Sequence, residues 1–141
     1  PEDMPLREWN KVINTNLTGT FLCCQIIGRV MIKQRIGKII NIASVSGFIG
    51  SVYLNAIGYT ASKGGVIALT RDLAIKWARY NIHVNGIAPG VFITRMTEWI
   101  KRPEMNEFYQ KLLDEIPMKK IGVIHNKIKK RQGRWKLLLK Q

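Results

Sequence analysis

Two short apolar runs, separated by a long segment of helical periodicity, constrain the fold of this chain more than any other feature. The runs 39–43 and 82–88 are rich in β-branched residues and are bounded by glycine, asparagine and proline, as buried strands are. The segment between them, 58–80, carries apolar side chains at helical spacing, and so does the segment 6–33 before the first run. Strands joined by a long helix predict a parallel βαβ unit with a right-handed crossover, and therefore an α/β fold.

Two loops directly follow the predicted strands. Residues 44–57 are rich in serine and glycine, and residues 89–94 begin with proline and glycine. In a parallel sheet the ligand site forms outside the carboxyl ends of the strands, so we expect both loops to face one crevice. Beyond them, short helices are expected at 94–101 and 104–114, and the first long helix is expected to bend near Gly19.

A tyrosine and a lysine at the start of the second long helix give the first chemical signal. Tyr59 and Lys63 are four residues apart, which places them on one helix face, about 6 Å apart along the axis. A free phenol has a pKa of about 10, and a fixed ammonium nearby lowers it by stabilising the phenolate. The pair could act as general acid and base for a hydroxyl-to-carbonyl conversion, although many helix surfaces carry such a pair without function. The preceding loop adds Ser44 and Ser46, whose hydroxyls could bind a substrate oxygen.

Four stretches, in order along the chain, resemble the signatures of the short-chain dehydrogenase/reductase family. They are 9–19 (WNKVINTNLTG), 41–47 (NIASVSG), 59–65 (YTASKGG) and 85–90 (NGIAPG). The resemblance covers residues 1–122 and implies the catalytic half of a doubly wound, Rossmann-like parallel sheet. It also implies an oxidoreductase that interconverts a secondary alcohol and a carbonyl by hydride transfer with NAD or NADP. The motifs are most similar to those of gluconate 5-dehydrogenase-like and other sugar or polyol members, so the implied substrate is a small alcohol or ketone such as a sugar acid or polyol.

The resemblance also implies catalytic roles for residues of this chain. Tyr59 would donate or accept the proton, and Lys63 would lower the pKa of Tyr59 and hold the nicotinamide ribose. Asn16 would support a proton relay to Lys63. The substrate-binding serine has two candidates: the usual spacing of thirteen residues to the tyrosine selects Ser46, whereas the motif position after the strand selects Ser44. We favour Ser44, because the end of a strand fixes a position more tightly than the length of a loop does.

Contacts with the cofactor are implied for a second, overlapping set of residues. This set comprises Tyr59, Lys63, Pro89, Gly90, Phe92 and Thr94. The glycine-rich turn with which the family binds the cofactor phosphates does not occur in this sequence. The segment that would bind most of the cofactor, and select NAD or NADP, is therefore expected to be missing.

The missing segment leaves a second interpretation open. The chain would then be a truncated, catalytically inactive remnant, or a subunit that associates with an intact relative. Intact members of the family pair through the two long helices, so we expect a homo-oligomer formed through helices 6–33 and 58–80. Two strands with two helices would otherwise expose apolar faces.

Positive charge is concentrated at the end of the chain. The formal net charge is +14, but nine of the 23 Lys and Arg lie within 119–141, which contains no acid, so residues 1–118 carry only +5. The composition changes abruptly after Gly122. We therefore separate a catalytic half, 1–122, from a basic tail, 123–141, which is either the product of a frameshift or a genuine extension. A solvated tail explains the charge without a specific nucleic-acid partner.

Several other classes of protein are not favoured. No apolar run reaches the roughly 20 residues of a membrane span and no signal peptide is visible, so we expect a cytoplasmic protein without a membrane partner. The neighbouring Cys23 and Cys24 are expected to be reduced core thiols. His83 and His125 lie far apart without other ligand residues nearby, so no metal site is expected.

Overall fold

The first long helical segment runs almost without interruption at the start of the chain. A computed structural model describes residues 1–50, 56–123, 129–131 and 134–136, grouped in two compact units, Pro1–Gly90 and Val91–Gln141. In the first unit, helix α1 (Leu6–Ile13) passes through a π-helical turn (Asn14–Thr18) into helix α2 (Gly19–Gln34). This confirms the predicted helix at 6–33, and the wider π turn directly precedes Gly19, near which a bend was expected.

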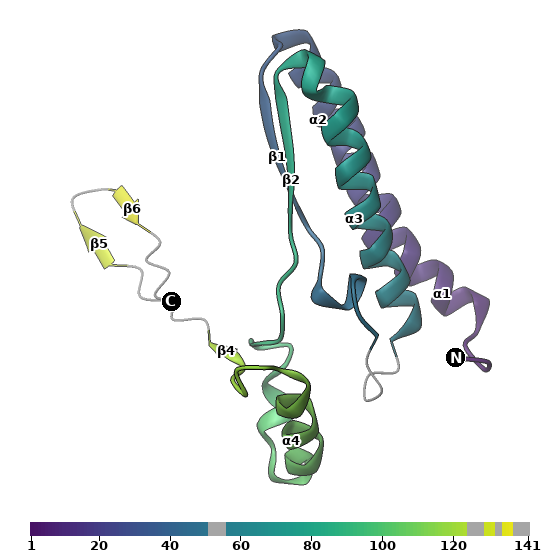
Figure 1. The fold of residues 1–141 in the computed structure, drawn as a ribbon, viewed down its shortest axis with the longest axis vertical. Coiled ribbons are helices and arrows are strands. Elements are labelled where there is room, and N and C mark those ends of the chain that lie inside the picture. Colours follow the sequence, from purple (N-terminus) through teal and green to yellow (C-terminus); the bar gives the residue numbers. More distant parts are fainter. Residues whose placement is uncertain (51–55, 124–128, 132–133, 137–141) are drawn as a thin grey trace. The chain divides into compact units, whose positions relative to one another are not determined.

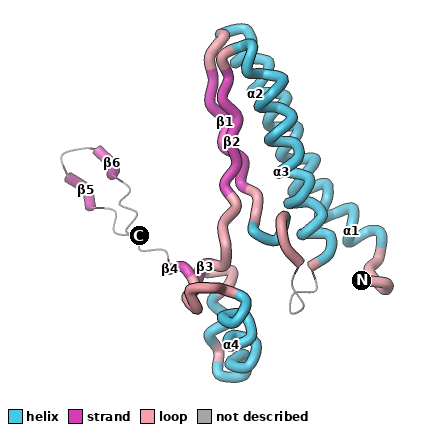
Figure 2. The backbone as a smooth tube through the Cα atoms, viewed as in Figure 1, coloured by secondary structure: helices cyan, strands magenta, loops and turns pink. Residues whose placement is uncertain are grey.

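The strands of the first unit pair as the sequence predicts. Strand β1 (Gly37–Ile42) and strand β2 (Ile82–Ile87) lie side by side (Figure 2). They are parallel, with residues 37 to 42 opposite residues 82 to 87 in order. Helix α3 (Ile57–Trp77) and a short 3₁₀ turn (Ala78–Tyr80) connect them. Asn81 adopts the left-handed conformation, with φ of 60°, and ends the turn. The βαβ unit is therefore confirmed.

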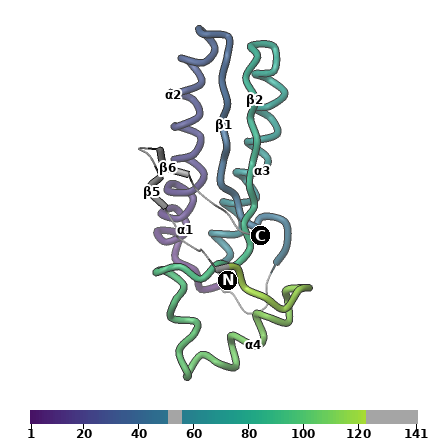
Figure 3. Tube along the Cα trace, turned by 90° about the vertical axis from the view of Figure 1, so that its left-hand side faces the viewer, coloured from purple at the N-terminus to yellow at the C-terminus, as the bar shows by residue number. Residues whose placement is uncertain are grey.

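Helices α2 and α3 run alongside the strand pair (Figures 1 and 3) and bury only one of its faces. Ile82 and Val84 of β2 are buried, whereas Ile40 and Ile42 of β1 are 61% and 53% exposed. Side chains alternate between the two faces of a strand, so these isoleucines lie on the face opposite the helices. Both strands were predicted to be buried, and this prediction was wrong for the face away from the helices, where Ile87 of β2 is also 51% exposed.

A small core joins the helices to the strand pair. Cys24, Leu73, Ile82 and Val84 form its buried centre, and Met31, Leu69 and Trp77 are among the partly buried residues around it. Cys24 is a core thiol, as expected, but Cys23 is exposed because its side chain leaves the helix on another side.

The second unit begins with a short parallel strand pair. Strand β3 (Phe92–Ile93) pairs with strand β4 (Gly122–Val123), and helix α4 (Asn106–Glu115) lies between them in the sequence. Two 3₁₀ turns precede this helix, at Glu98–Lys101 and Pro103–Met105. The helix predicted at 104–114 is confirmed, but the one predicted at 94–101 is only a 3₁₀ turn.

Two further short strands, β5 (Lys129–Arg131) and β6 (Arg134–Lys136), form an antiparallel pair within the predicted basic tail. The boundary expected after Gly122 stays a prediction. Across the part of the chain that the structure describes, no helix is both long enough and apolar enough to span a bilayer.

Candidate active site

The two loops that follow β1 and β2 are hydrogen-bonded to each other. The amide of Ala43 donates to the carbonyl oxygen of Ile87 at 2.8 Å, which extends the strand ladder by one step beyond the end of β1. The amide of Val45 then donates to the carbonyl oxygen of Pro89 at 3.1 Å. Both loops therefore leave the same edge of the sheet side by side, as expected for a site at the carboxyl ends of parallel strands.

Tyr59 and Lys63 lie on the first turns of α3, next to this edge. The Lys63 ammonium donates to the carbonyl oxygen of Ile42, the last residue of β1, at 2.8 Å. The same nitrogen lies 5.7 Å from the centre of the Tyr59 ring. Because the strand-end carbonyl holds it there, the ammonium remains beside a tyrosine that is 38% exposed and open to a ligand. The sequence predicted this pairing of Tyr59 with Lys63 from their spacing alone.

The serine-rich loop packs onto the start of α3. Ser44 has an extended backbone and is buried, and its Oγ accepts a hydrogen bond from the amide of Ser46 at 3.2 Å, which caps a 3₁₀ turn (Val45–Gly47). A Cβ added to Gly47 would lie 2.8 Å from the backbone carbon of Lys63 and 2.9 Å from the amide nitrogen of Gly64. The absence of a side chain at Gly47 therefore allows the turn to approach the residues that follow Tyr59. Residues 51–55 of the loop lie outside the described residues.

Asn16 lies in the π turn and is linked to α3 through a residue that the sequence did not single out. The Asn16 side-chain amide donates to Ser62 Oγ at 3.1 Å, and Ser62 Oγ donates to the carbonyl oxygen of Tyr59 at 2.7 Å. The carbonyl oxygen of Asn16 accepts a hydrogen bond from Thr20 Oγ1 at 2.7 Å. The only sequence signal for Ser62 was its place directly before Lys63 and three residues after Tyr59.

The residues expected to contact the cofactor are divided between the two units. In the first unit, Gly90 directly follows Pro89, and a Cβ added there would meet nothing within 4 Å. In the second unit, the backbone amide of Thr94 donates to Thr97 Oγ1 at 2.8 Å, and that hydroxyl donates to the carbonyl oxygen of Phe92 at 2.6 Å. Thr97, which the sequence did not indicate, therefore holds the backbone on both sides of Ile93.

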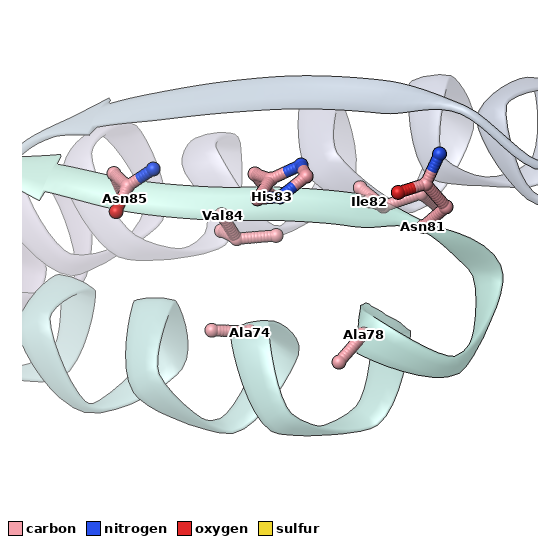
Figure 4. A pocket seen from close by; sticks show the side chains of 7 residues that line it. All are labelled: Ala74, Ala78, Asn81, Ile82, His83, Val84 and Asn85. Carbon is pink, nitrogen blue, oxygen red and sulfur yellow. The ribbon is translucent and has the colours of Figure 1, made fainter.

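A pocket of about 740 Å³ borders Tyr59. It is lined by residues 1–5, Val12 and the chain from Ala56 to Tyr59, so the start of the chain forms one wall of it. A smaller pocket of about 230 Å³ lies between the end of α3 and β2, around His83 and Asn85 (Figure 4). It contains none of the predicted site residues. Among the described residues, no three of the His, Cys, Asp and Glu side chains come together in a group that could hold a metal ion.

Comparison with known proteins assigns the family. Residues 1–105 match the model of the family described as short chain dehydrogenase. This chain belongs to the short chain dehydrogenase family. The resemblance that four sequence motifs indicated is thereby confirmed.

Curated relatives and solved structures agree with this assignment. The chain is 43% identical over 119 residues to a 3-oxoacyl-[acyl-carrier-protein] reductase of Aquifex aeolicus, covering 84% of this chain and 46% of the relative. It is 44% identical over 102 residues to the 5-keto-D-gluconate 5-reductase of Escherichia coli, covering 72% and 39%. A gluconate 5-dehydrogenase from Burkholderia cenocepacia, solved with NADP and tartrate, superposes with a TM-score of 0.74 at 31% identity, over 86% of this chain and 46% of that one. The Rossmann-like α/β fold is confirmed by these structures, and the chain spans about half the length of the curated relatives it matches.

Proposed function

We propose that this chain carries the catalytic residues of an NAD(P)-dependent oxidoreductase that interconverts a secondary alcohol and a carbonyl. The observation that carries the proposal is the Lys63 ammonium, which is held on the carbonyl oxygen of Ile42 and lies 5.7 Å from the Tyr59 ring. The strand-end carbonyl therefore keeps an ammonium and a phenol together at the start of α3, where a proton donor and acceptor for a bound hydroxyl is needed. The family assignment supports the same reaction class.

Each side chain of the site has a separate role in this reaction. In the oxidation direction, Tyr59 accepts the hydroxyl proton of the alcohol, and in the reduction direction it returns a proton to the carbonyl oxygen. Ser44, at the end of β1, binds the substrate oxygen through its hydroxyl, with Ser46 as the alternative. Asn16 supports the passage of the proton between Lys63 and water. When bound, a nicotinamide cofactor would supply the hydride acceptor for the oxidation and the hydride donor for the reduction.

The nicotinamide end of the cofactor is assigned to residues of the first unit. Tyr59 and Lys63 would hold its ribose hydroxyls, and Pro89 and Gly90 would lie along the ring; Phe92 and Thr94, in the second unit, stay predicted contacts. The open space at Gly90 supports this assignment, because glycine allows a ligand to approach the backbone closely. Solved relatives have been described with NADP and with NAD⁺, and both nucleotides are therefore candidates.

The substrate is a small alcohol or ketone, and a sugar acid or polyol is our first candidate. The support comes from the relatives, because the pocket of about 740 Å³ beside Tyr59 is lined by none of Asn16, Ser44 and Lys63. Similar proteins are described as a 5-keto-D-gluconate 5-reductase and a 2-dehydro-3-deoxy-D-gluconate 5-dehydrogenase. Both descriptions name sugar acids.

Self-association through the long helices is part of the proposal. Helix α2 exposes a series of large apolar side chains, each between 41% and 59% accessible: Phe21, Leu22, Ile26, Ile27 and Val30. A series of this kind is unfavourable in water and is commonly covered by a protein partner. A second copy of the chain would cover it.

Turnover of Tyr59 variants tests the proposed reaction. The chain is incubated with NAD⁺ or NADP⁺ and a panel of sugar acids and polyols, and the reduced nicotinamide is followed by its absorbance. Because the chain spans about half of its relatives, the assay is repeated with residues 1–105 replacing the matching segment of the Aquifex reductase. Tyr59→Phe is expected to lower kcat by at least about 100-fold.

The control variant is Tyr80→Phe, since Tyr80 lies in the 3₁₀ turn after α3, where its ring packs on the apolar core and against the guanidinium groups of Arg35 and Arg79. This control should leave kcat unchanged. Equal rates for Tyr59→Phe and the parent protein would contradict the proposal. The absence of turnover in both protein contexts would favour the inactive remnant instead.

A further inference from the structure

Ser62 is buried at the junction between the π turn and α3, and it is not among the residues that line the pocket beside Tyr59. Ser62 has 0% exposure, and among the described residues it and Val66 are the largest side chains that are fully buried. We propose that Ser62 is a positioning residue that fixes the Asn16 side chain against the helix that carries Tyr59 and Lys63. This inference rests on the proposed function, because it assigns Ser62 a part in the same proton transfer.

The direction of each hydrogen bond in this link is determined by the chemistry of its groups. A serine hydroxyl has a single hydrogen, and Ser62 donates it to the carbonyl oxygen of Tyr59 at 2.7 Å. The Ser62 hydroxyl can therefore only accept a hydrogen bond from Asn16. Only the amide nitrogen of Asn16 can pair with them, at 3.1 Å, so the orientation of the amide is fixed. Rotation of Asn16 would leave a buried hydroxyl without its partner.

The backbone around Asn16 has an unusual conformation that the hydrogen bond to Ser62 accompanies. Asn16 lies in a π-helical turn, a wider turn that often marks functional sites in helices. The hydroxyl of Thr20 donates a hydrogen bond to the backbone carbonyl oxygen of Asn16 at 2.7 Å. The side-chain amide nitrogen of Asn16 is thus bonded to Ser62 and its backbone carbonyl oxygen to Thr20, so one hydrogen bond holds its side chain and another holds its backbone.

Close packing accompanies the polar link on the same face of α3. Gly65 follows Ser62 by three residues, and a Cβ added to Gly65 would lie 2.7 Å from Leu17 Cδ2. Helix α3 therefore approaches the π turn closely through Gly65 and Leu17, and the bond between Ser62 and Asn16 is the polar part of this contact. Removal of the hydroxyl would loosen Asn16 while the apolar contact stays in place.

The chain contains a matched pair with the same bonding pattern away from the site. Thr70, two turns further along α3, donates its hydroxyl to the carbonyl oxygen of Val66 at 2.7 Å and accepts the side-chain amide of Asn41 at 3.0 Å. Thr70→Val and Ser62→Ala each remove one buried hydroxyl that links α3 to an asparagine on another element. The two variants should therefore lose comparable stability, read as comparable shifts of the urea midpoint, but only one should affect catalysis.

The test measures kcat and KM in the assay that shows turnover for the parent protein, for Ser62→Ala, Thr70→Val, Asn16→Ala and the double variant of Ser62 and Asn16. We expect Ser62→Ala to lower kcat by about 10-fold to 100-fold, as a misplaced catalytic group does, with KM within about twofold. Thr70→Val should leave kcat within about twofold. The double variant should be no slower than Asn16→Ala, because Ser62 acts through Asn16.

Two outcomes would overturn the inference: a Ser62→Ala protein with the kcat of the parent, or a double variant that is slower than Asn16→Ala by the full Ser62→Ala factor. If Ser62→Ala does not fold, Ser62→Thr decides, because it keeps the hydroxyl. A folded Ser62→Thr protein with parental kcat supports the inference, and one as slow as the other catalytic variants overturns it. Tyr59→Phe is measured alongside. If Tyr59→Phe keeps full turnover, the proposed function itself fails. If Tyr59→Phe loses turnover and Ser62→Ala keeps it, only the role of Ser62 is refuted.

Discussion

Substitution of Gly47 tests how closely the serine loop must approach α3. A Cβ at this position would lie 2.7 Å from Ile67 Cδ1, 2.8 Å from the backbone carbon of Lys63 and 2.9 Å from the amide nitrogen of Gly64. The φ of Gly47 lies outside the left-handed region, so alanine is compatible with its backbone. The effect of Gly47→Ala therefore comes from crowding alone.

The cost follows from what the new methyl group would meet. The Ile67 side chain can rotate away, but the two backbone atoms of α3 cannot, so the turn must move away from the helix. Overpacking of this kind costs about 1–3 kcal/mol. Gly50 provides the control in the same loop, since a Cβ there would meet nothing within 4 Å. Gly50→Ala should be neutral or should stabilise by about 0.4–1 kcal/mol through the unfolded chain.

Urea unfolding followed by tryptophan fluorescence measures the difference between the two variants. A gap of about 2 kcal/mol, with an m-value of about 2 kcal/mol/M, places the midpoint of Gly47→Ala about 1 M below that of Gly50→Ala. Equal midpoints would show that the turn does not pack on α3 at this distance. The reasoning about the site would then lose the contact that places the turn after Ser44 against Lys63 and Gly64.

The remaining predictions concern the thiols and the apolar face of α2. Burial raises the pKa of the Cys24 thiol, only partly offset by its hydrogen bond to Asn41, whereas Cys23 is exposed. Iodoacetamide at about pH 8 should therefore modify Cys23 first, as read by mass spectrometry of the peptides, and equal rates at both thiols would refute this burial. Because folding raises the pKa of Cys24, the contribution of this thiol to stability is complete below its pKa in the unfolded chain and is lost as the pH rises through its pKa in the folded protein. Urea midpoints should therefore fall in the alkaline range, and they should fall less for Cys24→Ser. Ile26→Lys should reduce self-association in sedimentation experiments, whereas Met118→Lys, a control in the second unit at a more exposed position, should not. An unchanged mass for Ile26→Lys would exclude α2 from the interface.

Hydrophobic periodicity predicted the elements of the first unit but not which of their faces are covered. The βαβ order and the helix stop at Asn81 followed from local patterns of residues, which act over a few positions along the chain. The exposure of Ile40 and Ile42 did not, because a run of β-branched residues looks the same whether one or both faces are covered.

Sequence patterns found the residues of the site but not the hydrogen bonds that orient them. Tyr59 and Lys63 were recognisable because helical spacing places them together. The link from Asn16 to Ser62 was not, because it depends on a π turn and on a contact between residues 46 positions apart. Thr97 was missed for a similar reason, since its hydroxyl bonds backbone groups whose arrangement only the folded loop defines.

The transfer of deuterium from substrate to nucleotide tests the central claim most directly. An alcohol deuterated at its carbinol carbon is incubated with NAD⁺ or NADP⁺ and the protein, and the nucleotide is analysed by mass spectrometry. The account predicts that deuterium appears in the reduced nucleotide with the parent protein and is lost with Tyr59→Phe. Deuterium in the nucleotide at equal rates with both proteins, or with neither, would contradict the assignment of Tyr59 as the acid and base of this reaction.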